Sequence, residues 1–231
     1  MGHLKIDFHE YPKTVAPDDF WGQVGRTVRG KPVSEEQIRM IVDAIKAGLR
    51  LEQSDCLLDI ACGNGALSRL LFDSCSGYLG YDFSEYLIEV AKKNFARPPQ
   101  FDFAVGSAAE YVEAEPQPQR YTKALCYGSF AYFSYEDAER TLRALAGRFK
   151  RISTVYIGNL PDRDLAHLFY QDGRDYAKEL SDNTAQIGIW RSRKEFEELA
   201  TKTGWRIRFH VMPKEFYSSH YRYDAILERL D

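Results

Sequence analysis

The chain has 231 residues, of which 44% are hydrophobic and 14% aromatic, and this composition is sufficient for a substantial core within one domain. Its formal net charge of −3, without any run of Lys and Arg, argues against a nucleic-acid partner. No segment approaches the roughly 18 consecutive apolar residues that a membrane span requires, and the first residues hold no apolar signal core. We therefore predict no membrane partner and a cytoplasmic location.

The cysteines fall within or beside apolar segments, at Cys56, Cys62, Cys75 and Cys126. They share no C-x-x-C spacing, so the sequence supports neither a zinc cluster nor a disulfide framework. We expect reduced thiols and no bound metal.

An aromatic segment with several prolines and no clear period occupies residues 1–33. Its aromatic side chains would be costly to leave in water, so we expect an arm that lies ordered against the domain. Ser34 and Gln37 then match a capping box, and apolar residues follow with helical spacing. The pattern predicts a first helix over 34–49.

Short apolar runs then alternate with helical patterns. The predicted strands lie near 56–60, 78–82, 101–105, 122–127 and 151–158. The predicted helices lie near 65–75, 84–95 and 135–149. Strands that alternate with helices imply βαβ units, and therefore an α/β fold with a doubly wound, mostly parallel sheet.

Residues 159–191 interrupt this alternation. The segment is longer than the usual connection in such folds, and we interpret it as an insertion that contains a helix of its own. Ser192 and Glu195 then form an S-x-x-E box that opens a helix to about residue 203, and "WRIRFHV" and "YRYDAIL" predict two closing strands. No repeat is present, so we interpret residues 1–231 as a single domain.

The stretch "LLDIACGNGALS" places a carboxylate, Asp59, at the end of an apolar strand and just before a turn through Gly63 and Gly65. An ionised carboxylate taken out of water is costly unless a cation pairs with it. In a doubly wound sheet the ligand crevice lies outside the carboxyl ends of the strands, where this stretch is expected. Asp59 is therefore expected beside a bound group that is cationic.

The next strand, "GYLGYDF", ends on Asp82, 23 residues after Asp59. A carboxylate in this position can accept the hydroxyls of a ribose, and dinucleotide sites share the spacing. The glycines do not match G-x-G-x-x-G, and Asp59 would be a poor neighbour for phosphates. A ligand with an ammonium group beside a ribose suits the pair better. A nicotinamide-dependent oxidoreductase and a non-catalytic nucleotide-binding module remain alternatives.

"LLDIACGNGALS" followed by "GYDFSEYLIEVAKKN" resembles motifs I and II of the class I S-adenosylmethionine-dependent methyltransferases. The resemblance covers roughly residues 34–158 and the closing strands more loosely. It implies a seven-stranded Rossmann-like sheet, an enzyme that transfers methyl groups, and S-adenosylmethionine as cofactor.

By position in these motifs, the resemblance implies a set of residues around the cofactor. Around the methionine portion it implies Asp59, Ala61, Gly63 and Gly65, where Ala61 replaces a frequent glycine. It implies Asp82 on the ribose and Phe83 against adenine. It also implies Ser107 and Ala108 at the adenine edge and Cys126 with Tyr127 beside the methyl donor, although the family often has an acid where this chain has Ser107.

The acceptor is predicted by exclusion to be a small molecule, because the charge pattern shows no nucleic-acid footprint. The basic residues of the arm suggest a lid in which Arg26 or Arg29 holds a carboxylate or phosphate of the acceptor. We also predict Tyr132 and Tyr221 as substrate-binding residues, and His220 and Tyr127 as catalytic residues. We expect methylation on oxygen or nitrogen and a monomer or homodimer.

Overall fold

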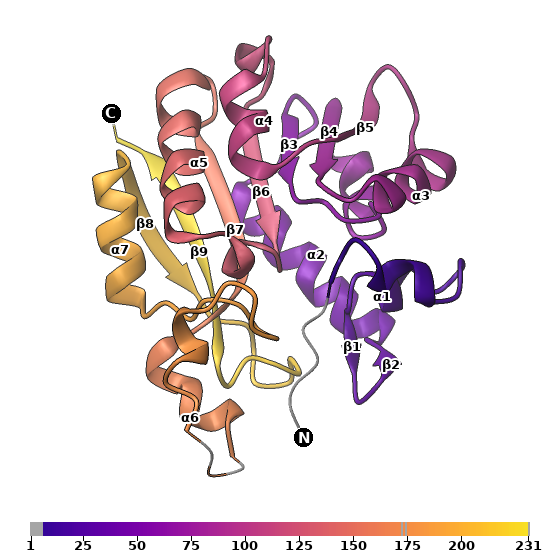
Figure 1. Ribbon diagram of the computed structural model, residues 1–231. Helices are drawn as coiled ribbons and strands as arrows, with labels where there is room; N and C mark the ends of the chain where they lie inside the picture. The colour runs from indigo at the N-terminus through magenta and orange to yellow at the C-terminus, as the bar shows by residue number, and fades with distance from the viewer. Residues whose placement is uncertain (1–6, 172, 174, 231) are drawn as a thin grey trace.

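A seven-stranded sheet forms the centre of the protein, in the order β5-β4-β3-β6-β7-β9-β8 (Figure 1). The computed structural model describes residues 7–171, 173 and 175–230, so residues 1–6 of the predicted arm lie outside the described part. The strands are β3 (Cys56–Ile60), β4 (Gly77–Asp82), β5 (Phe101–Val105), β6 (Lys123–Tyr127), β7 (Thr154–Pro161), β8 (Trp205–His210) and β9 (Arg222–Arg229). The sheet is parallel except where β9 pairs with β7 and β8. The predicted doubly wound, mostly parallel sheet is confirmed.

Helices cover both faces of this sheet. They are α2 (Glu35–Leu49), α3 (Glu85–Phe95), α4 (Ala108–Ala114), α5 (Tyr135–Arg148) and α7 (Arg193–Lys202). In β3, Leu57 packs into the same core cluster as Ile41 of α2, and Leu58 packs into the cluster that contains Leu142 of α5. Successive strand residues therefore bury apolar side chains on opposite faces. A carboxylate in a strand that is buried on both faces is costly unless a partner or a ligand interacts with it.

Serine caps determine where several helices begin. In four helices a serine side chain accepts the N–H three residues further on: Ser34, Ser84, Ser134 and Ser192. The predicted capping box of Ser192 and Glu195 is confirmed. At Ser34 only half of the predicted box forms, because the Gln37 side chain donates to the carbonyl oxygen of Glu215 instead. Gln37 thus connects α2 to the loop before β9.

Two local expectations differ from the structure. The segment 65–75, predicted as a helix, contains a 3-10 helix over Ser68–Ser74. Gly63 and Gly65 have left-handed φ angles of 59° and 73°, which delay the start of helical structure. The helix α4 was not predicted, because seven residues are too few to show a helical period.

The arm is folded and is fastened to the loop that follows β3. It contains a 3-10 helix (Tyr11–Thr14), α1 (Phe20–Gln23) and a hairpin of β1 (Thr27–Val28) with β2 (Lys31–Pro32). The buried amide of Asn64 donates to the carbonyl oxygen of Phe20 at 2.8 Å and to the side-chain oxygen of Gln23 at 2.9 Å. The loop "CGNG" therefore holds the arm as well as shaping a turn.

Strand β7 runs as far as Pro161, so the irregular connection begins later than the predicted start at residue 159. Within its described part it contains two 3-10 turns and the four-residue helix α6 (Ala166–Phe169). Its aromatic residues form a separate cluster around Trp190, which includes Tyr170 and Tyr221. The arm hairpin and α6 lie at the lower end of the molecule in Figure 1, toward which strand β6 points.

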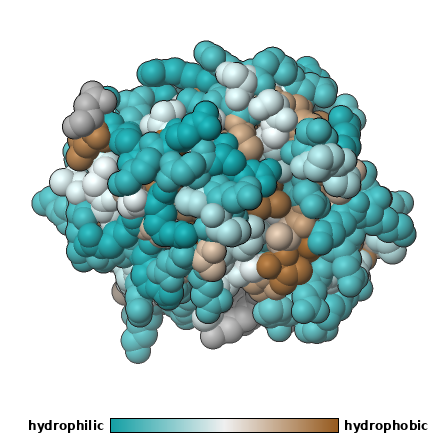
Figure 2. All heavy atoms as spheres, turned by 90° about the horizontal axis from the view of Figure 1, so that it is seen from above, coloured by the Kyte–Doolittle hydropathy of each residue, from teal (hydrophilic) through white to brown (hydrophobic). Residues whose placement is uncertain are grey.

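The face seen in Figure 2 is mostly hydrophilic, and apolar side chains appear there only in small groups. Within the described ranges, no helix combines the length and the apolar character that crossing a membrane requires.

Candidate active site

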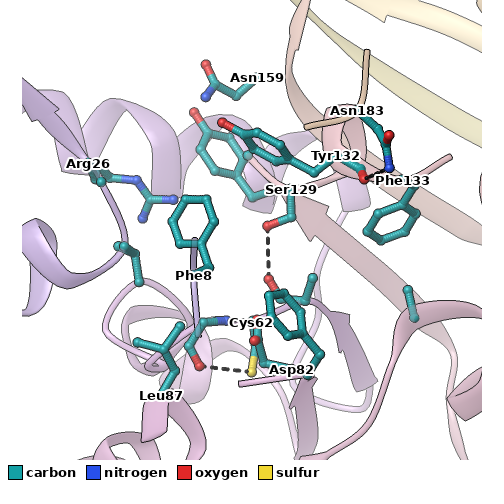
Figure 3. Close-up of a pocket in the computed structure, with 18 of the residues that line it drawn as sticks. Phe8, Arg26, Cys62, Asp82, Leu87, Ser129, Tyr132, Phe133, Asn159 and Asn183 are labelled. Atoms are coloured by element: carbon teal, nitrogen blue, oxygen red, sulfur yellow. Dashed lines mark hydrogen bonds between the residues drawn. The ribbon is translucent and has the colours of Figure 1, made fainter. Parts of the chain in front are cut away.

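A cavity of about 1050 Å³ lies among the loops that follow the strands β3, β4, β6 and β7. Arm residues from Asp7 to Tyr11 and insertion residues from Asn183 to Ile187 also line it. In Figure 3, Cys62, Asp82 and Leu87 lie at one end of the cavity, and Arg26, Asn159 and Tyr132 lie toward the other. This is the crevice in which open α/β sheets bind their ligands.

Asp59 lies at the base of this cavity and is 3% exposed. Its Oδ2 accepts a short hydrogen bond from Ser68 Oγ and another from Tyr78 Oη at 3.0 Å. Among the described residues, Oδ1 accepts no hydrogen bond, and no ion pair reaches the carboxylate. Burial raises the pKa of Asp59 to about 7. The charge of Arg26 opposes this effect but forms no ion pair with Asp59, so the carboxylate remains open to a cationic ligand.

Asp82 shapes the turn that follows the first motif. Its Oδ2 accepts the N–H of Gly63 at 2.9 Å, and its Oδ1 accepts the N–H of Ser84 at 3.0 Å. Burial raises the pKa of Asp82, and its backbone donors oppose this effect. Asp82 therefore fixes the backbone around Gly63 and also presents a carboxylate to the cavity.

Ala61 has a left-handed φ of 56°, which an alanine rarely adopts. Its carbonyl oxygen accepts a hydrogen bond from Ser129 Oγ at 3.2 Å, which joins the loop after β3 to the loop after β6. The residue lines the cavity where the resemblance implies a glycine. Its backbone conformation is thus the one that a glycine would take without strain.

Two further groups line the cavity beyond β4. Phe83 is 42% exposed, and the arm residue His9 approaches its ring with centroids 4.6 Å apart. Ser107 Oγ donates to Glu110 Oε2 at 2.6 Å, and both residues face the cavity along with Ala108. The resemblance implies an acid at the position of Ser107, and in this chain an acid, Glu110, lies three residues later on α4.

Arg26 brings a cation into the cavity from the arm. Its guanidinium lies 5.6 Å from the ring centroid of Trp21 and 5.3 Å from that of Tyr127. The side chain makes no hydrogen bond or ion pair within the described part of the chain. A guanidinium held between aromatic rings and without a carboxylate partner can bind an anion.

Tyr127, Tyr132 and Tyr221 also line the cavity. The hydroxyl of Tyr127 is buried and has no hydrogen-bond partner among the described residues. Burial raises the pKa of Tyr127 well above its ordinary value, so this phenol stays protonated at neutral pH. Tyr132 Oη instead donates to the carbonyl oxygen of Gln186, which joins it to the insertion.

Four of the predicted site residues do not line the cavity. Gly65 packs against Phe103, since a Cβ there would lie 2.7 Å from its ring. Cys126 is 1% exposed in the core. Arg29 is exposed in the turn of the arm hairpin, and His220 lies in a separate depression with Met212 and Phe216. We assign no role in catalysis or binding to these four residues.

Other cavity residues were missed in the sequence. The most informative are Asn159, Arg222, Glu110 and Asn183. Asn159 has a left-handed φ of 65° inside a strand pattern, a strained conformation often found at functional sites. The dipeptide "GN" within the apolar run before residue 160 was the available signal, because glycine in a strand marks a bulge.

Comparisons with known proteins agree with this geometry. The family described as "Methyltransferase domain" matches residues 57–151. A probable cobalt-precorrin-6B C(15)-methyltransferase (decarboxylating) of Methanocaldococcus jannaschii is 32% identical over 69 residues, which are 29% of this chain. The match spans about a third of that relative, or 36% of its length.

Solved structures show the same fold. A magnesium protoporphyrin IX methyltransferase from Synechocystis PCC 6803 with bound S-adenosylhomocysteine is similar with a TM-score of 0.64 and 18% identity, over 96% of this chain and 97% of the other. The small RNA methyltransferase HEN1 is similar with a TM-score of 0.63 and 16% identity, over 90% of this chain and 26% of the other. These neighbours differ in acceptor, so the fold leaves the acceptor open.

The residues of the cavity fit S-adenosylmethionine. The unused Oδ1 of Asp59 suits an ammonium group, and Ala61 and Gly63 line the cavity beside it with a left-handed backbone. With the matching methyltransferase domain, this fit distinguishes the site from a nicotinamide site. Residues 57–151 thus match a methyltransferase domain, and the fold around them is that of solved methyltransferases.

Proposed function

We propose that this chain transfers a methyl group from S-adenosylmethionine to an oxygen or nitrogen of a small acceptor that carries a carboxylate or phosphate. One observation carries the proposal: the same cavity contains a buried carboxylate, Asp59, and a guanidinium, Arg26, and neither forms an ion pair with the other or with any other described residue. The first matches the ammonium group of the cofactor. The second matches a negatively charged acceptor.

In this proposal the cofactor lies along the loops after β3, β4 and β5. Asp59, Ala61 and Gly63 contact the methionine portion, and Asp82 accepts the ribose hydroxyls. Phe83 lies against adenine. Ser107 and Glu110, which are hydrogen-bonded to each other, accept a hydrogen bond from the adenine amino group, and Ala108 lies beside them. The structure supports this arrangement, because the Phe83 ring is exposed and Ser107 donates a hydrogen bond to Glu110.

The bound cofactor supplies an activated methyl group on a sulfonium. Methyl transfer is an in-line displacement, so the residues of this chain act mainly by aligning the acceptor and excluding water. The described cavity residues include no histidine other than His9 of the arm. Tyr127, with its raised pKa, serves packing rather than proton abstraction. An acceptor atom that is already deprotonated or that carries a lone pair suits this site best.

The arm and the insertion favour a small acceptor over a polymer. Phe8 contacts Tyr132 with ring centroids 5.8 Å apart, and Asn183 Nδ2 donates to the carbonyl oxygen of Tyr132 at 3.3 Å. Both segments thus meet over the acceptor end of the cavity, as lids do. The net charge of −3 adds no attraction for RNA. We interpret the described part of the arm, residues 7–33, as this lid.

The cofactor assignment is tested by calorimetry with S-adenosylhomocysteine. Asp59→Ala and Asp82→Ala should each weaken binding by about tenfold or more, since each removes a charge-assisted contact. Retention of wild-type affinity in both variants would contradict the proposed binding mode. Circular dichroism of each variant distinguishes lost contacts from lost folding.

The acceptor class is tested with radiolabelled S-adenosylmethionine and a cell extract. We expect label in the small-molecule fraction and not in RNA or protein; label in RNA or protein alone would exclude a small acceptor. Once an acceptor is isolated, Arg26→Gln should raise its KM about tenfold while S-adenosylhomocysteine affinity stays constant. Arg29→Gln is the matched control, because Arg29 lies in the exposed hairpin turn. Equal KM values in the two variants would exclude a role for Arg26.

A further inference from the structure

Gly128, in the loop that follows β6, lies between two side-chain nitrogens that donate no hydrogen bond to the described residues. Gly128 lines the cavity with a φ of 81°. A Cβ built on it would lie 3.7 Å from Arg26 Nη2 and 3.8 Å from Asn159 Nδ2. Neither nitrogen donates a hydrogen bond within the described residues. Both donors therefore flank the space that the absent side chain leaves free.

Asn159 is held in place by all of its other polar atoms. Its N–H donates to Asp224 Oδ1 at 2.8 Å, and its carbonyl oxygen accepts a hydrogen bond from Arg222 Nη1. Its Oδ1 lies 3.5 Å from Ser218 Oγ, within hydrogen-bond range. These contacts fix the bulge of β7 where its register with β9 shifts. The amide Nδ2 is the atom left for a ligand.

Asp224 is itself firmly anchored. It is 2% exposed, and its Oδ2 accepts a hydrogen bond from Tyr156 Oη at 2.7 Å and lies 2.9 Å from His210 Nδ1. The left-handed φ of Asn159 would relax if this support were lost, since strained backbone persists only where its surroundings enforce it. The donor is therefore preorganised before any acceptor binds.

Arg222 adds a second positive charge behind Asn159. It forms no ion pair among the described residues, and its guanidinium lies 5.0 Å from the ring centroid of Tyr221. Tyr221 in turn contacts Phe169 with centroids 5.2 Å apart, and both rings line the cavity. The donors thus adjoin an aromatic wall.

We propose that Gly128, Arg26 and Asn159 form a seat for the carboxylate of an aromatic acid, with its ring against the aromatic wall of Tyr221 and Phe169. The seat offers one guanidinium and one amide, which match the two oxygens of a carboxylate. This inference deepens the proposed function and rests on it. It specifies which residues bind the carboxylate and which class of acceptor carries that group, whereas the charge of Arg26 alone specifies neither.

The test uses full-length protein saturated with S-adenosylhomocysteine and titrated by calorimetry with benzoate, benzamide and inorganic phosphate. Benzoate should bind at least tenfold more tightly than its neutral isostere benzamide and than phosphate. Equal affinity for benzoate and benzamide, or no benzoate binding, would overturn the seat. Tighter binding of phosphate would overturn the carboxylate assignment.

Two variants locate the binding to Asn159. Asn159→Asp keeps the shape and tolerates the left-handed φ but places a negative charge at the seat, so benzoate should weaken at least tenfold. Asn159→Gly also tolerates this φ, removes the side chain with its Nδ2, and should weaken benzoate about fivefold or more. Wild-type benzoate affinity in both variants would overturn the proposal.

Asn94→Asp is the control for the change in net charge, because Asn94 is exposed on α3 and lies outside the cavity. We expect less than a threefold change in benzoate affinity there. An equal loss in Asn94→Asp and Asn159→Asp would show a general charge effect and would overturn the seat. Failure of the wild type to bind S-adenosylhomocysteine would instead count against the proposed function.

Discussion

Tyr78 donates a hydrogen bond to Asp59 Oδ2 at 3.0 Å, in a part of the sheet where both side chains are almost fully buried. Ser68 donates to the same oxygen. Two hydroxyls on one carboxylate oxygen do not neutralise its charge, so burial still raises the pKa of Asp59 to about 7. The ligand-free protein thus carries an acid whose ionisation weakens the fold.

The first prediction concerns stability and pH. The pKa of Asp59 is about 7 in the folded protein, compared with 3.8 for an ordinary aspartate, so the folded state holds the proton more tightly. The contribution of Asp59 is therefore full below about pH 4 and is lost as pH rises toward 7, at up to about 1.4 kcal/mol per pH unit. Asp59→Asn can keep both hydroxyl donors and should remove this loss. Urea unfolding without ligand at pH 5 and pH 8 measures it.

The control for this comparison is the pH dependence of the variant relative to the wild type. The difference in unfolding free energy should move in favour of Asp59→Asn between pH 5 and pH 8. A constant difference over this range would show that Asp59 ionises normally.

The second prediction concerns proton release on cofactor binding. An ammonium group beside Asp59 would lower the pKa of this carboxyl, so binding of S-adenosylhomocysteine at pH 6.5 should release protons. Its affinity should fall as pH drops below 7, by up to about tenfold per pH unit. Calorimetry in two buffers of different ionisation enthalpy measures the release. Asp59→Asn should release fewer protons, and equal release in both proteins would exclude this contact.

The third prediction separates packing from catalysis at Tyr127. Its buried hydroxyl has no partner among the described residues, and such a group costs about 1–3 kcal/mol. Tyr127→Phe should therefore raise the free energy of unfolding by about 1 kcal/mol and keep methyl transfer. The matched control is Tyr156→Phe, which removes a 2.7 Å hydrogen bond to Asp224 and should lower stability. A large loss of kcat in Tyr127→Phe would restore the sequence-based catalytic assignment.

The fourth prediction concerns the strained backbone at Ala61. A left-handed alanine costs roughly 1–2 kcal/mol, and the extra freedom of glycine in the unfolded chain offsets part of this. Ala61→Gly should therefore raise the free energy of unfolding by about 0.5–1 kcal/mol, measured by denaturant unfolding. Ala96→Gly is the control, because Ala96 has a φ of −62° and should gain nothing. Equal effects at both positions would show that Ala61 is not strained.

The sequence alone was enough for the sheet and for the acids of the candidate site. Strand β3 and the position of Asp59 follow from a buried apolar run that ends on a carboxylate, and such local patterns persist in the fold because both faces of the strand are covered. Asp82 follows from the same rule one strand later. The confirmed capping box of Ser192 and Glu195 involves only four adjacent residues.

Only the tertiary structure decided the acceptor end of the cavity. Arg26 and Arg29 look alike in the sequence. In the structure, Asn64 holds the arm against the loop after β3, Arg26 lines the cavity, and Arg29 lies in an exposed turn. The backbone of Asn159 is held by Asp224, which is 65 residues away in the chain and accepts its N–H. Contacts between distant segments depend on how strands and loops meet in space, and no local period of the sequence records them.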